Sequence, residues 1–190
     1  MSSQLASRAH LVSRDKVERV IANLLVASNG ATTKLGRSAT MSPPSDRKRF
    51  HALRSRAHAI VIGGNTFRKE PYSQCALPLY VATSRPEGQI LDETTIDPLR
   101  RLLNLAPADI VDVALAEQGA PVLVEGGVRF LQPLIEKSLI DTFYITRTTE
   151  DGDGNFFDDR HLSKTYRLEL SEVDDGATFE IWKPLKLQQN

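Results

Sequence analysis

The sequence contains little of what marks the specialised classes of protein. Cys75 is the single cysteine among 190 residues, so no disulfide forms within the chain, and a reducing compartment, the cytoplasm, is expected. Lys and Arg number 24, as do Asp and Glu, which excludes the basic surface of a general nucleic-acid-binding protein. The apolar fraction is 41%, close to the globular norm, and this excludes wholesale disorder.

Long hydrophobic runs are also missing. The first apolar run covers residues 20–27 and contains Asn23, whereas a membrane-spanning helix needs about 20 apolar residues. No small-residue cleavage site follows that run, so it does not read as a signal peptide. We therefore predict a protein without a membrane partner, with a flexible arm over residues 1–15 and a single domain over residues 16–190.

What the chain does contain is an alternation of β-branched runs and helical patterns. Strands are predicted at 17–27, 57–62, 77–83, 121–124 and 140–148, and helices at 43–56, 97–103, 108–118 and 128–138. Ser42 is a candidate cap for the first of these helices, and residues 29–42 read as a loop. An antiparallel pair, 165–173 and 178–183, closes the chain around a turn at 174–176. This order predicts an α/β fold of three αβα layers, with a mixed, mostly parallel sheet and antiparallel C-terminal strands.

Ligands of such sheets bind at the carboxyl ends of the strands, where this chain has glycines and polar residues. Glu125, Gly126 and Gly127 follow one strand and precede a helix, so they suit either a pyrophosphate or a tight structural turn. Neither Gly-x-Gly-x-x-Gly nor Gly-Lys-Ser/Thr is present, which excludes a Rossmann fingerprint and a nucleoside-triphosphate loop.

Two further segments suggest phosphate binding without deciding it. Residues 83–85, Thr-Ser-Arg, offer two hydroxyls and a guanidinium suited to the 2′-phosphate of NADP, although this is also ordinary loop composition. The helix at 43–56 is rich in basic residues. They form either a solvated face or, through Arg47 or Arg54, a contact to a phosphorylated substrate.

Several chemistries find no support. The four histidines have no His-x-x-x-His spacing and no Cys-x-x-Cys is present, so we predict no metal site. Residues 151–155 imitate a calcium loop, but Leu162 occupies the position of its bidentate Glu, so an acidic loop is expected. Cys75 has no evident base beside it and is treated as incidental.

Two blocks of the sequence resemble the reductase domain of riboflavin biosynthesis, which has a dihydrofolate-reductase-like fold. That domain forms the C-terminal half of a bacterial bifunctional deaminase–reductase and also occurs alone. The similarity runs from about residue 17 to residue 145. It rests on Ser38, Met41-Ser42, Leu53-Arg54, His58-Ala59-Ile60, Gly63 and Thr66, and on Val122–Gly127 followed by Leu139-Ile140-Asp141.

This resemblance implies a homodimer that transfers a hydride from NADPH to the ribose C1 of a ribosylamino-pyrimidine phosphate. By the same resemblance Glu125 and Asn29 are the candidate catalytic residues. The substrate is expected at Ser38, Arg54, Thr66 and Glu70, with Arg54 on its phosphate. The cofactor is expected at Gly63, Thr83, Ser84, Arg85, Gly126 and Gly127.

Some positions depart from the family pattern. Asn29 stands where most members have Asp, and an amide cannot carry charge or exchange a proton as a carboxyl does. Lys69-Glu70-Pro71 replaces Asp-Asp-Pro. Pro44, Asp46 and Phe50 imitate the helix of dihydrofolate reductase whose acid binds the pterin, but no Leu-Pro-Trp precedes them. Three alternatives therefore stay open: an NADPH reductase of another substrate, dihydrofolate reductase itself, and a non-catalytic nucleotide-binding relative.

Overall fold

The computed structural model describes residues 18–70, 72, 75–84 and 99–185. The predicted arm at 1–15 and the candidate residue Arg85 lie outside these ranges. Within them, no helix has the length and apolar character needed to cross a membrane.

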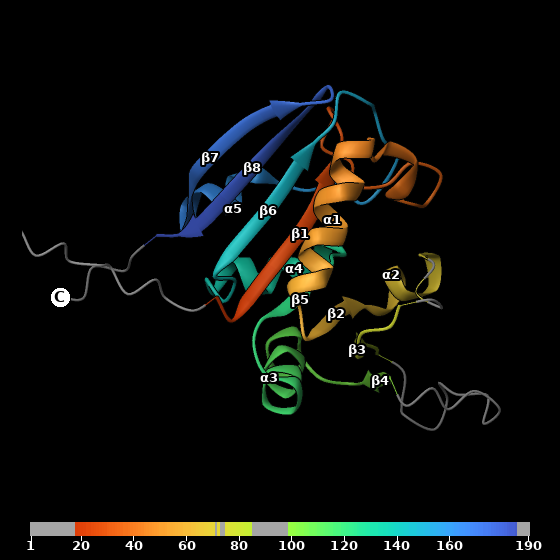
Figure 1. Ribbon diagram of the computed structural model, residues 1–190, viewed down its shortest axis with the longest axis vertical. Coiled ribbons are helices and arrows are strands. Elements are labelled where there is room, and N and C mark those ends of the chain that lie inside the picture. Colours follow the sequence, from red (N-terminus) through yellow and green to blue (C-terminus); the bar gives the residue numbers. More distant parts are fainter. Residues whose placement is uncertain (1–17, 71, 73–74, 85–98, 186–190) are drawn as a thin grey trace, which may run out of the picture.

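An eight-stranded sheet forms the centre of the fold, in the order β4-β3-β2-β5-β1-β6-β8-β7 (Figure 1). The strands are β1 (Val20–Val26), β2 (Ala59–Gly63), β3 (Leu79–Ala82), β4 (Arg100–Leu103), β5 (Val122–Val124), β6 (Thr142–Arg147), β7 (Tyr166–Asp174) and β8 (Ala177–Pro184). The first six pair in parallel, while β8 is antiparallel to both β6 and β7. The predicted mixed sheet with antiparallel C-terminal strands is confirmed.

The β7–β8 turn shows why the sequence signal there was reliable. Asp175 and Gly176 both have positive φ, 52° and 74°, as the two central residues of a type I′ hairpin turn require. An Asp-Gly pair reaches this conformation at little steric cost, so the turn fixes the register between Asp174 and Ala177.

Alternate residues of the central strand pack on opposite faces of the sheet, which creates the three layers. Val20, Ala22, Leu24 and Val26 belong to the core beneath α3 (Pro107–Gln118), α4 (Val128–Glu136) and α5 (Asp159–Thr165). Ile21 instead clusters with Leu53 of α1 (Pro44–Arg56), which crosses the other face (Figure 1). The strand is thus buried on both sides, as its unbroken apolar run indicated.

The prediction of a helix at residues 97–103 is wrong. Residues 100–103 form β4, which extends the sheet beside β3, with Leu79 opposite Arg100 and Ala82 opposite Leu103. Leucines at 99, 102 and 103 fit one face of a helix equally well, and only the free edge of β3 decides for a strand. Leu103 is buried as a result.

Two short α-helices and a 3-10 helix, η1 (Ala39–Met41) within the predicted loop, were not anticipated, and one cap was misplaced. The helix α2 (Gly64–Lys69) follows β2 at the Gly63-Gly64 pair, and α5 precedes β7. Pro43, not Ser42, is the N-cap residue of α1, and the Ser42 hydroxyl donates a hydrogen bond to the Asp46 carboxylate one turn later.

Candidate active site

A cleft of about 1140 Å³ lies at the carboxyl ends of the parallel strands. Because these strands run in one direction, their last residues and the loops after them share one edge of the sheet. All but two of the predicted site residues line the cleft: Ser38, Arg54, Gly63, Thr66, Glu70, Thr83, Ser84, Glu125, Gly126 and Gly127. Asn29 is not in the lining, and Arg85 is outside the described residues.

Glu125 lines the cleft directly after the buried strand β5. Its backbone N–H donates to the carbonyl of Val61 at 3.1 Å, which ties the residue to the middle of β2. Arg54 approaches the carboxylate as a fork, with Nε 2.6 Å from Oε1 and Nη2 2.6 Å from Oε2. Tyr72 donates its hydroxyl to Oε2 at 2.9 Å. The Glu125 side chain is only 3% exposed, so these three donors take the place of water around its charge.

The surroundings hold Arg54 in its charged form. Burial acts to lower the pKa of Arg54, but the hydrogen bonds and charge of Glu125 outweigh it, so its pKa lies above the usual value. The guanidinium also lies over the ring of Phe50, 4.2 Å from its centroid. Burial, followed by the charge of Glu125, raises the pKa of Tyr72 well above 10, so Tyr72 stays a hydrogen-bond donor at neutral pH.

Tyr72 is a site residue that the sequence did not reveal. It lies in an irregular segment between α2 and β3, where composition gives no signal. Arg100 of β4 donates to the backbone carbonyls of Tyr72 at 2.7 Å and of Cys75 at 3.0 Å. The unexpected strand β4 therefore helps to hold Tyr72 against Glu125.

Ser38 and Glu70, both predicted to bind substrate, bind each other. The backbone N–H and the hydroxyl of Ser38 donate to Oε1 of Glu70, at 2.8 and 3.0 Å. This contact joins the loop after β1 to the end of α2 across the cleft. The second carboxylate oxygen of Glu70 makes no bond within the described residues, so it remains an acceptor.

The turn between β5 and α4 forms a cradle of backbone. Gly126 and Gly127 have φ values of +74° and +56°, and a Cβ added to Gly127 would lie 3.1 Å from Thr66 Oγ1. The first turn of α4 follows at Val128 and Arg129, which also line the cleft. The N–H groups of a first helical turn have no partner within the helix, so this geometry fits a pyrophosphate group.

Beside this cradle, α2 and the end of β3 are also in close backbone contact. A Cβ added to Gly64 would lie 2.8 Å from the carbonyl oxygen of Ala82, so α2 packs directly against the end of β3. Thr83 and Ser84 follow that end and line the same part of the cleft. The glycines and hydroxyls expected to hold a dinucleotide are therefore neighbours across three strand ends.

Asn29 is placed differently from the other candidates. Its side-chain amide donates to the carbonyl of Gly152 at 2.9 Å and accepts from the N–H groups of Ala31 and Gly152, each at 3.2 Å. The residue ties the loop after β1 to the loop after β6. Asn29 does not line the cleft, and its catalytic role stays a prediction.

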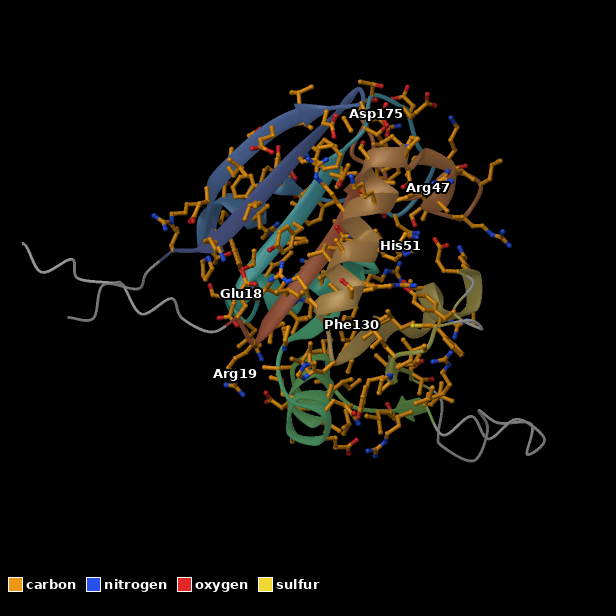
Figure 2. The ribbon with its side chains drawn as sticks, in the orientation of Figure 1. Glu18, Arg19, Arg47, His51, Phe130 and Asp175 are labelled. Carbon is orange, nitrogen blue, oxygen red and sulfur yellow. The ribbon has the colours of Figure 1, made fainter. Side chains whose placement is uncertain are left out.

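The face of α1 that borders the cleft carries further polar residues. Asp46, Arg47, His51 and Arg54 recur at helical spacing, and Figure 2 labels Arg47 and His51 along this helix. Arg47 is exposed, and within the described ranges no carboxylate pairs with it. No group of three or more His, Cys, Asp or Glu able to hold a metal occurs among the residues that the structure describes.

The family model described as the RibD C-terminal domain matches residues 19–148. The chain belongs to this family. The resemblance to the reductase domain of riboflavin biosynthesis, seen in the two sequence blocks, is thereby confirmed. No match is found among curated proteins.

Solved structures agree with this fold. A protein from Shewanella sp. PV-4, assigned to riboflavin biosynthesis, superposes with a TM-score of 0.69 at 20% identity, covering 88% of this chain and 99% of its own. A diaminohydroxyphosphoribosylaminopyrimidine deaminase/5-amino-6-(5-phosphoribosylamino)uracil reductase from Thermotoga maritima gives a TM-score of 0.66 at 13% identity. That superposition covers 89% of this chain and 57% of the Thermotoga protein.

Proposed function

We propose that this protein is an NADPH-dependent reductase that acts on the ribose C1 of a ribosylamino-pyrimidine phosphate. One observation carries the proposal: the buried carboxylate of Glu125, which accepts three hydrogen bonds, lies beside the glycine cradle in a single cleft. Membership of the RibD C-terminal domain family supports a reductase, and the name of the Thermotoga relative supports the substrate class. We further propose that it works in the cytoplasm.

The cradle suits the cofactor. Gly126, Gly127 and the first turn of α4 would hold the pyrophosphate, and Thr83 and Ser84 the adenosine end. NADPH supplies a hydride when bound. We propose that Arg85 binds the 2′-phosphate, so Arg85→Ala is expected to weaken NADPH binding and to leave NADH binding unchanged. An equal loss for both nucleotides would contradict this role.

Glu125 orients the substrate in this proposal. A carboxylate offers about four acceptor positions, and Arg54 and Tyr72 together occupy three of them. One position at Oε1 is left to accept a single N–H or O–H donor from the ribosylamino group. Tyr72 and Arg54 keep the carboxylate in place while it does so.

The substrate phosphate requires a revised assignment. Arg54, the expected phosphate ligand, already gives its fork to Glu125, so only its Nη1 remains for a phosphate. Arg47 lies two helical turns before Arg54 on the same cleft wall and has no carboxylate partner within the described residues, so we propose it as the phosphate ligand. The occupation of Arg54 by Glu125 also favours a second candidate function, an NADPH reductase of a substrate without a phosphate.

The decisive experiment combines nucleotide titration with turnover. Nicotinamide fluorescence is expected to report tighter binding of NADPH than of NADH. The ribosylamino-pyrimidine phosphate should then oxidise NADPH. The KM of its dephosphorylated form should be higher than that of the phosphate. Equal KM for the two forms would favour the second candidate, and NADPH binding without turnover of either form would indicate a non-catalytic relative.

We also propose a homodimer. The edge strand β7 exposes Leu168, Leu170 and Val173, the last of them 78% exposed, and an apolar edge strand favours pairing with another chain. Light scattering is expected to give twice the monomer mass, and Leu170→Lys to reduce it. A monomer in the wild-type protein would refute this proposal.

A further inference from the structure

Two adjacent phenylalanines after β6 point in opposite directions. Phe157 packs edge-to-face on Phe143 of the core, with ring centroids 6.1 Å apart, and its N–H donates to the carbonyl of Gly30 at 2.8 Å. Phe156 is 60% exposed and lines the cleft. An aromatic ring that is exposed in the lining of a cleft is available to contact a molecule bound there.

The backbone around Phe156 is held firmly. Asn155 has a φ of 54°, and its carbonyl accepts a hydrogen bond from Thr32 Oγ1 at 2.7 Å. The N–H of Thr32 donates to the carbonyl of Gly154 at 3.0 Å. At Gly152 an added Cβ would lie 2.6 Å from the carbonyl oxygen of Thr33, so the two loops are in direct backbone contact. Phe156 therefore presents its ring from a fixed point.

The sheet order places Phe156 in one half of the cleft. The glycine cradle follows β5, and the other candidate cofactor residues follow β2 and β3, which lie on one side of β5. The loops that carry Thr32 and Phe156 follow β1 and β6, on its other side. Glu125 stands between the two halves. Phe156 consequently faces the part of the cleft that the dinucleotide cradle does not occupy.

We propose that Phe156 is a platform on which the planar pyrimidine ring of the substrate stacks. A ring of this kind offers an aromatic face that a phenyl ring binds without hydrogen bonds. Stacking at this position would orient the substrate with its ribosylamino group toward Glu125. The inference rests on the proposed function and makes Phe156 a residue that touches substrate and leaves the cofactor untouched.

The test compares Phe156→Ala with Phe156→Tyr and a control, Leu35→Ala. Leu35 is 83% exposed on the loop after β1 and does not line the cleft. The Kd of the pyrimidine product and the KM of the substrate should each rise about tenfold or more in Phe156→Ala. Phe156→Tyr should stay close to the wild type, because it keeps the ring. NADPH affinity, measured by fluorescence, should be unchanged in all three variants.

The outcomes separate this inference from the proposed function. If the wild type binds the product and Phe156→Ala binds it equally well, the platform is refuted and the proposed function stands. A loss of NADPH affinity as large as the loss of product affinity would also refute it, because the ring would then serve the cofactor. If the wild type binds no ribosylamino- or ribitylamino-pyrimidine, the proposed function fails and the inference falls with it.

Discussion

The contact between Arg54 and Glu125 gives the sharpest prediction about stability. Glu125 has a side chain that is 3% exposed in the wild-type protein, and in Arg54→Met it keeps only the Tyr72 hydroxyl as a side-chain donor. Breaking a buried ion pair by removing one partner leaves an uncompensated charge and costs about 3–5 kcal/mol. The free energy of unfolding should fall by that amount.

The reverse change should cost less, because the two partners differ in their access to water. The Arg54 side chain is 23% exposed, so in Glu125→Gln the guanidinium can still be hydrated, and the amide oxygen can still accept one of its hydrogen bonds. We expect about 1–3 kcal/mol for this change. The double variant, Arg54→Met with Glu125→Gln, leaves no buried charge and should be closer to the wild type than Arg54→Met alone.

Urea unfolding at neutral pH, followed by circular dichroism, measures all four corners of this double-mutant cycle. A coupling energy of about 2 kcal/mol or more is expected. Arg49→Met is the matched control on the same helix, because Arg49 and its partner Asp174 are 38% and 58% exposed. Exposed pairs contribute about 0–1 kcal/mol. If Arg54→Met costs no more than Arg49→Met, the burial argument is refuted.

Three further predictions concern the core, acid stability and the loop tether. Leu53→Ala should reduce the free energy of unfolding by about 2–5 kcal/mol, because Leu53 is 6% exposed on the face of α1 that packs on the sheet, and a loss below about 1 kcal/mol in urea would contradict that packing. Burial acts to raise the pKa of Glu18, but hydrogen bonds from Thr142 and Lys183 outweigh it, so the pKa is lowered and its stabilisation is lost as the pH falls below about 4.5. Glu18→Gln should flatten this acid-side loss of stability, whereas Glu172→Gln, an exposed residue of β7, should follow the wild-type curve. Asn29→Ala should speed amide exchange in residues 150–155 without lowering global stability by more than about 1 kcal/mol, and unchanged exchange there would refute the tether.

Local patterns predicted most of the fold because they matched the tertiary outcome. The apolar run at β1 predicts a strand buried on both faces, and Asp175-Gly176 predicts the hairpin turn by its own backbone preference. At residues 100–103 the local pattern does not distinguish a helix from a strand, because the spacing of the leucines fits either one. Pairing with β3, a contact distant in sequence, decided the outcome.

The same distinction between local pattern and tertiary contact applies to the candidate site. The sequence by itself determined which segments carry the chemistry, because Glu125, Gly126 and Gly127 follow a strand directly and parallel strands bring their ends to one edge. Only the tertiary structure decided what each side chain contacts. It gives the fork of Arg54 to Glu125, brings Tyr72 in as the third donor, turns Asn29 toward Gly152 and leaves Phe156 facing the cleft. These contacts join elements far apart along the chain, and a burial that forces charges to find partners is a property of the packed fold, which no local pattern encodes.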